Sequence, residues 1–156
     1  MCGNVEIIPP ADVAAIARID AALATCKLDF MNVRHTFGDG IYTRTGIIAA
    51  GEIIIGAKHR AANVFHIARG KIWVWDEFHG TRLLEGPFSE MTKPGTQRIG
   101  IAVTEVEGSN IFQTEKITRD EVEAEMLYPF TLPADAGKKI LILLNENQAK
   151  QIAPAS

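Results

Sequence analysis

Short apolar runs alternate with turn residues through the middle of the chain. Between Gly51 and Arg98 the runs are rich in Ile, Val, Phe and Trp, and each ends at a glycine, a Pro-Gly pair or a charged cluster; they span residues 52–58, 62–68, 71–77 and 81–84. This punctuation is typical of β-strands joined by tight turns. No segment long enough for a core helix interrupts the series. The pattern predicts an antiparallel β-sandwich or barrel.

The same pattern continues on both sides of this stretch. Gly38-Asp39-Gly40 predicts a tight turn that needs positive φ. Further strands are expected at residues 41–45, 88–91, 99–106 and 110–114. We therefore place the barrel at residues 31–116, with an N-terminal arm and helix at 1–30 and a C-terminal region at 117–156.

The two flanks differ from the barrel in their periodicity. Residues 12–27 are rich in alanine and carry apolar side chains at helical spacing, which predicts an amphipathic helix. This helix could pack on its own barrel or dock on a neighbouring subunit. Thr118 followed by Glu121 is a capping box that opens a short helix to about Met126. Residues 138–144 could pair as a further strand, and residues 145–156 predict an extended, mobile tail or an arm that a partner orders.

Composition narrows the class of protein. The 156 residues are 47% hydrophobic and 22% charged, which is typical of a folded domain. A net charge of −3 gives no basic field for nucleic acid. No apolar run approaches the ~20 residues that span a bilayer, and the first residues do not resemble a secretion signal. Cys2 and Cys26 are expected to be reduced thiols. We expect a soluble protein with no nucleic-acid or membrane partner.

Three motifs occur in a fixed order: Gly56-Ala57-Lys58-His59, then Ile67-Ala68-Arg69-Gly70, then Lys93-Pro94-Gly95-Thr96-Gln97-Arg98. This order resembles the cupin superfamily, and more narrowly the small cupin-like proteins encoded by bacteriophages. The resemblance covers about residues 40–125. It implies a mainly β fold, a jelly-roll barrel built as an antiparallel β-sandwich.

The resemblance also implies where a metal would bind. Cupin enzymes hold their metal with two histidines and a glutamate of the first motif and a histidine of the second. Those positions here carry Ala57, His59, Asn63 and Arg98, so only His59 is retained of the ligand set. One imidazole beside a fixed positive charge is a poor site for a transition metal. We expect no metal and no cofactor.

The residues at these positions suggest a different pocket. His59, Asn63 and Arg98 should point into the barrel, with Tyr42 as a further candidate, and Arg98 beside a neutral histidine suits a carboxylate or phosphate. Alternatively, Arg98 pairs with a glutamate and plugs the barrel mouth. Strand alternation sends His66 to the opposite face from Asn63, which makes it a candidate for a surface or an interface rather than a ligand. Trp73 and Trp75 share one face and are candidates for an interface, or for core packing.

Two functions follow as hypotheses. The first is a non-enzymatic structural protein of a bacteriophage virion (a head, connector or tail accessory). It would be assembled in the host cytoplasm as a homo-oligomer that contacts other virion proteins. No catalytic residues are assigned, because no nucleophile motif surrounds the serines or cysteines. The alternative is a cupin enzyme or small-molecule anion binder that uses the pocket around His59 and Arg98.

Overall fold

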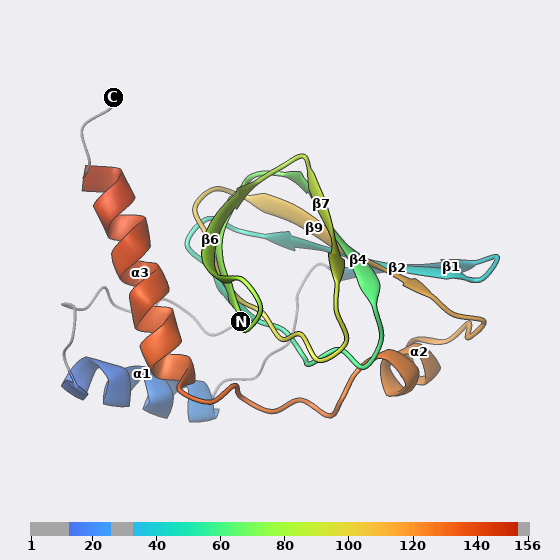
Figure 1. Cartoon of the computed structure of the whole chain (residues 1–156), viewed down its shortest axis with the longest axis horizontal. Coiled ribbons are helices and arrows are strands. Elements are labelled where there is room, and N and C mark those ends of the chain that lie inside the picture. The colour runs from blue at the N-terminus through green and yellow to red at the C-terminus, as the bar shows by residue number, and fades with distance from the viewer. Residues whose placement is uncertain (1–12, 26–32, 153–156) are drawn as a thin grey trace.

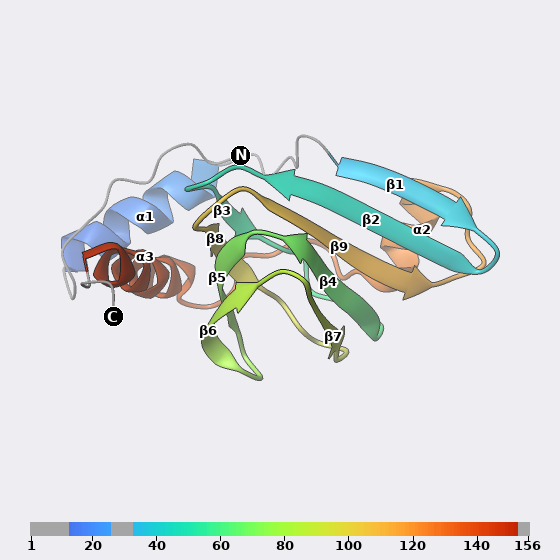
Figure 2. The ribbon, with the colours of Figure 1, turned by 90° about the horizontal axis from the view of Figure 1, so that it is seen from above.

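Two antiparallel sheets face each other to form the body of the molecule (Figures 1 and 2). The computed structural model describes residues 13–25 and 33–152. One sheet has five strands, in the spatial order β1 (Val33–Gly38), β2 (Ile41–Ile48), β9 (Val106–Gln113), β4 (Asn63–Arg69) and β7 (Phe88–Thr92). The other has four, in the order β3 (Ile53–Ile55), β8 (Ile99–Ala102), β5 (Lys71–Asp76) and β6 (Gly80–Glu85). The predicted β-sandwich is confirmed.

Alternating side chains build the core between the two sheets. The buried members are apolar and come from both sheets: Ile67, Ile72, Val74, Leu84, Ala102 and Val106. The turn between β1 and β2 has the predicted positive φ angles, 50° at Asp39 and 81° at Gly40. The strand expected at 99–106 is in fact two strands in different sheets, because β8 ends at Ala102 and β9 begins at Val106.

Two helices cover the outer face of the four-stranded sheet. Helix α1 (Val13–Thr25) packs on helix α3 (Ala136–Ile152), and α3 packs on β5 and β8 (Figure 2). The Gly137 backbone N–H donates to Asp20 Oδ1 at 2.9 Å, which ties the start of α3 to α1. Helix α1 thus packs on its own chain, which is one of the two alternatives that the sequence left open.

Helix α2 (Arg119–Met126) lies at the other end of the sandwich (Figure 1). Thr118 is its N-cap as predicted: the Thr118 hydroxyl accepts from the Glu121 N–H at 3.3 Å and lies 3.0 Å from the Glu121 carboxylate. Val122 and Met126 are buried against Tyr42 and Phe112 of the five-stranded sheet. The helix therefore closes that end of the barrel.

The C-terminal predictions need correction. Residues 138–144 form part of α3 rather than a strand, and the expected extended tail is helical to Ile152. Ala136, Ile140 and Leu143 are buried at i, i+4 and i+7, whereas Ile142 is 42% exposed, so the burial follows a helical period. Residues 1–12, 26–32 and 153–156, including Cys2 and Cys26, lie outside the described residues. Among the helices described, none is long and apolar enough to cross a membrane.

Candidate functional site

A cavity of about 160 Å³ lies between the two sheets. Most of its wall is apolar, and the apolar side chains come from both sheets: Ile48, Ile54, Phe65, Ile67, Ile72, Val74 and Val106. Its size is close to that of a cavity that holds benzene. The space therefore suits a small organic molecule.

Polar side chains gather at one end of the cavity. Arg44 of β2 lies opposite Asn110 of β9, and Ile48 lies opposite Val106 four residues further along the same pair of strands. His59, Thr96 and Arg98 also line the cavity. The ionisable side chains among the described lining residues are Arg44, His59 and Arg98, all basic. The cavity has a cationic end and an apolar end.

Arg98 is held on three sides. Its Nη2 atom donates to Thr92 Oγ1 at 2.8 Å and lies 3.3 Å from Glu90 Oε1, and its guanidinium carbon lies 4.1 Å from the centroid of the Phe65 ring. The Arg98 Nε atom is buried without a hydrogen-bond partner. The pairing with a glutamate, which was one of the predicted alternatives, is present, yet it engages only one of the guanidinium nitrogens.

The side-chain amides of Asn110 and Asn63 form a chain of hydrogen bonds that ends at His59. Asn110 Nδ2 donates to Asn63 Oδ1 at 3.0 Å, and Asn63 Nδ2 lies 2.7 Å from His59 Nδ1. The backbone fixes the same segment, because His59 N–H donates to the Thr96 carbonyl at 3.0 Å and His59 pairs as a β-bridge with Leu127. The predicted neighbours His59 and Asn63 are therefore in direct contact.

Burial and positive charge keep His59 neutral. Desolvation, followed by the charges of Arg98 and Arg44, lowers the pKa of His59 from 6.5 to about 4. Desolvation also lowers the pKa values of Arg44 and Arg98, which stay protonated because an arginine pKa lies far above neutral pH. Two cations and a neutral imidazole make an environment that favours an anion.

Tyr42 does not line this cavity. It is 2% exposed and lines a smaller space behind it, together with His59, Arg44 and Glu123. Its hydroxyl is 2.5 Å from His35 Nδ1, and its ring packs near Phe112. Tyr42 therefore packs behind the part of the cavity wall that Arg44 forms. Arg44 itself was missed, although alternation along β2 places it on the same face as Tyr42.

The three interface candidates lie on surfaces other than the cavity. His66 faces away from it, as strand alternation predicted, and its Nδ1 atom is 2.6 Å from Ser89 Oγ. Trp73 is only 7% exposed and packs with Ile140 and its neighbours under α1 and α3. Trp75 lies on the same face, where Lys139 Nζ is 3.9 Å from its ring centroid. Packing within the chain thus takes up most of the Trp73 surface, and an interface role for these residues stays a prediction.

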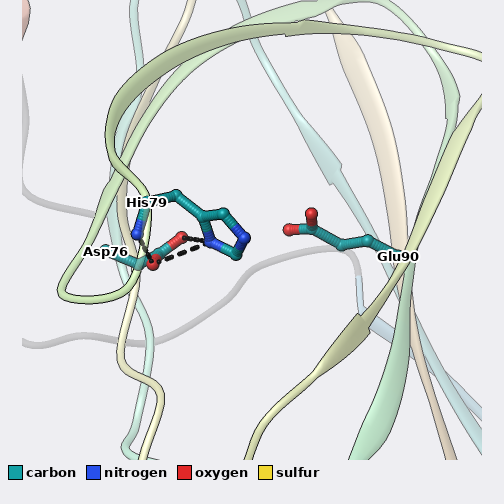
Figure 3. A group of neighbouring side chains, drawn as sticks. All are labelled: Asp76, His79 and Glu90. Carbon is teal, nitrogen blue, oxygen red and sulfur yellow. Dashed lines mark hydrogen bonds and ion pairs between the residues drawn. The ribbon is translucent and has the colours of Figure 1, made fainter.

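A second polar cluster was not identified from the sequence, where His79 was assigned no role beyond a turn. Asp76, His79 and Glu90 bring their potential ligand atoms within 4.8 Å of one another, with the His79 ring between the two carboxylates (Figure 3). Arg82 compensates both acids: its Nη2 atom lies 3.4 Å from Asp76 and 2.7 Å from Glu90, and its Nη1 atom lies 2.9 Å from Glu90. Arg82 thus supplies a positive charge that the two acids share, and the cluster is a partly buried ion-pair network.

Asp76 is saturated with donors. Its Oδ1 atom accepts from the backbone N–H groups of Phe78 at 2.8 Å and His79 at 2.9 Å. Burial by itself raises the pKa of Asp76, but these two N–H groups and the His79 ring together lower the pKa below its ordinary value. The network connects the β5–β6 hairpin to Arg98 through Glu90.

Solved structures share this architecture. Ectoine synthase from P. lautus aligns with 65% of this chain and 76% of its own at 16% identity, with a TM-score of 0.50. The chain has the cupin fold. A cupin superfamily protein from Desulfitobacterium hafniense aligns over 72% of this chain and 100% of its own at 10% identity, with a TM-score of 0.44. No protein-family model matches the sequence, and no curated protein matches it.

The cupin positions expected to hold a metal do not fit one here. Ala57 has no ligand atom, and Arg98 brings a guanidinium to the cavity. Asn63 offers His59 an amide N–H rather than a carboxylate. Of these positions only His59 offers an unambiguous metal ligand, so the set does not fit a transition metal.

Proposed function

We propose that this cupin-fold protein binds a small carboxylate inside the barrel. The observation that carries the proposal is that Arg44, His59 and Arg98 line one cavity, and that the Nε atom of Arg98 is buried without a hydrogen-bond partner. The carboxylate group would lie at this end, where the guanidinium of Arg98 has donors that Thr92 and Glu90 do not use. The apolar body of the ligand would lie against Ile48 and Val106.

The size of the cavity restricts the ligand. A volume of about 160 Å³ admits a molecule of the size of benzoate or a short branched acid, and excludes a nucleotide. The apolar end disfavours a second charged group, because burying an unpaired charge is costly. The expected ligand class is a monocarboxylate with a compact apolar body.

Calorimetric titration of the whole protein with benzoate, and with its neutral analogue benzamide, tests the proposal. We expect benzoate to bind and benzamide to bind at least about tenfold more weakly, because a charge-assisted hydrogen bond contributes roughly 1.5–3 kcal/mol. Isobutyrate serves as the aliphatic probe of the same charge. Equal binding of the acid and the amide, or no binding of either acid, would overturn the proposal.

A pair of arginine variants locates the site. Arg98→Gln should weaken carboxylate binding by about tenfold or more. Arg69→Gln is the matched control, since Arg69 lies on β4 but pairs with Glu105 at 2.7 Å on the surface, and it should leave binding unchanged. Equal effects of the two substitutions would place the binding outside the cavity.

The virion role, the homo-oligomer and the contacts with other virion proteins stay predictions from the sequence. Light scattering and co-sedimentation with purified particles test them independently of the cavity. A carboxylate-binding barrel is compatible with either a free or an assembled protein.

A further inference from the structure

The hydrogen bonds around Asn63 have a fixed direction. Asn63 Nδ2 donates to the backbone carbonyl of Ala61 at 3.3 Å, and Asn63 Oδ1 accepts from Asn110 Nδ2 at 3.0 Å. A carbonyl oxygen can only accept, so the nitrogen of the Asn63 amide must be on the Ala61 side. Reversing the amide would set its oxygen against the Ala61 carbonyl.

This direction decides which ring nitrogen of His59 carries the proton. The same Asn63 nitrogen lies 2.7 Å from His59 Nδ1, and an amide nitrogen can only donate. His59 Nδ1 must therefore be the acceptor, which leaves the ring proton on Nε2. A doubly protonated ring would place two donors against each other at this distance.

We propose that Asn63 and Asn110 are positioning residues that lock His59 as a neutral Nε2–H donor for an oxygen of the bound carboxylate. The identity of the acceptor rests on the proposed function. The fixed Nε2–H tautomer of His59, called the lock below, does not. His59 Nε2 makes no hydrogen bond to a described residue, and His59 lines the cavity. The donor adds to those of Arg98 at the cationic end.

The lock also excludes a metal. An imidazole binds a metal through an unprotonated nitrogen, and its other nitrogen then usually donates to a carboxylate or carbonyl. Here the nitrogen that accepts already faces Asn63, and the nitrogen left for the cavity carries a proton. His59 is retained from the expected ligand set, but its second partner gives it the opposite polarity.

The charged groups around His59 act in the same sense. Arg44 from β2 and Arg98 from the segment before β8 line the cavity beside it, and Glu123 from α2 lines the smaller space behind it. The two arginines disfavour a second proton on the ring, and Glu123, the carboxylate among the described residues that line either space, lies on the side of Tyr42. The positive charges therefore keep the ring neutral, and the hydrogen bonds of Asn63 select the tautomer.

Imidazole nitrogen NMR of the ¹⁵N-labelled full chain tests the lock without any ligand. We expect His59 to show a protonated Nε2 and an unprotonated Nδ1 between about pH 5.5 and 8, with the signal identified by its loss in His59→Gln. Asn63→Asp has the same shape but replaces the donor by an acceptor, so Nδ1 should become protonated and the pKa of His59 should rise. His66, which faces away from the cavity, is the reference ring and should be unchanged.

The outcomes separate the lock from the proposed function. A wild-type ring protonated on Nδ1, or Zn²⁺ binding that disappears in His59→Gln, would overturn the lock. If the lock is observed but benzoate does not shift the Nε2–H signal, the acceptor is wrong while the tautomer stands. If Asn63→Asp does not fold, Asn110→Ala replaces it, because this variant removes only the outer amide and should admit a measurable fraction of the Nδ1–H tautomer. A His59 ring that is unchanged in every variant that folds would refute the role of the amides.

Discussion

Arg82 forms a bidentate ion pair with Glu90: its Nη1 atom lies 2.9 Å from one carboxylate oxygen, and its Nη2 atom lies 2.7 Å from the other. The pair joins β6 to β7 and so connects the two sheets. Glu90 also lies 3.3 Å from Arg98, and hydrogen bonding to Arg82 is the main cause that lowers the pKa of Glu90. One carboxylate thus compensates two arginines inside the sandwich.

Neutralising Glu90 should destabilise the protein. Glu90→Gln leaves Arg82 and Arg98 without their shared counter-charge, and we expect a loss of about 2–4 kcal/mol in the free energy of unfolding measured in urea. The control is Glu85→Gln, whose 64% exposed side chain lies 3.9 Å from Lys71 and which should change stability by less than about 0.5 kcal/mol. Equal stability of the two variants would show that the network is not a stabilising contact.

Acid should destabilise the protein through His59. The folded pKa is about 4 and the ordinary value is 6.5, so between these pH values the unfolded chain binds a proton that the folded protein refuses. Stability is therefore complete above pH 6.5 and falls as the pH approaches 4, by on the order of 2–3 kcal/mol. Thermal unfolding across this range measures the effect.

His59→Gln should flatten this pH dependence because it removes the titrating group. Some dependence should remain, since desolvation and the charges of Arg119 and Arg44 also lower the pKa of His35. Asp76 and Glu90 act in a lower window: their depressed pKa values contribute stability that is lost below their ordinary values near pH 4. An identical acid profile for wild type and His59→Gln would contradict the assignment.

Helix α3 offers a test of the corrected C-terminal region. Ile140 is fully buried and Ile142 is 42% exposed, although a strand would place both on one face. Ile140→Ala should cost about 2–4 kcal/mol because it opens a cavity beneath α1, whereas Ile142→Ala should cost less than about 1 kcal/mol. Chemical denaturation of the two variants decides between the helix and the strand, which predicts similar losses.

The sequence was a good guide to the barrel and to helices α1 and α2, and a poor one to α3. Strands β4 and β5 are short apolar runs that end at Gly70 and at the charged pair Asp76-Glu77, so local information suffices. Gly70, for example, has a φ of 96°, and an added Cβ would lie 2.1 Å from the Glu105 carbonyl. Residues 138–144 read alone as an apolar run, and only the surface formed by Trp73 and α1 shows which of them are buried.

The candidate site likewise combines residues that were identified from the sequence with contacts that only the structure shows. His59 and Arg98 were identified because the motif spacing places them, and the structure brings His59 into contact with Asn63. The direction of the Asn63 hydrogen bonds depends on Asn110 and the Ala61 carbonyl, of which Asn110 is 47 positions away in the chain. His79 looked like a turn residue because Glu90, the third member of its cluster, lies across the sandwich on another strand.

The packing of α1 against α3 joins two helices that lie on either side of the strands in the sequence. Asp20 and Gly137 are joined by a hydrogen bond across 117 positions, and both helices cover the face of the four-stranded sheet that holds Trp73. A fragment cut to the strands alone would expose this apolar face to water. The smallest autonomous piece of the protein therefore includes both helices, and fusion partners belong beyond them rather than in their place.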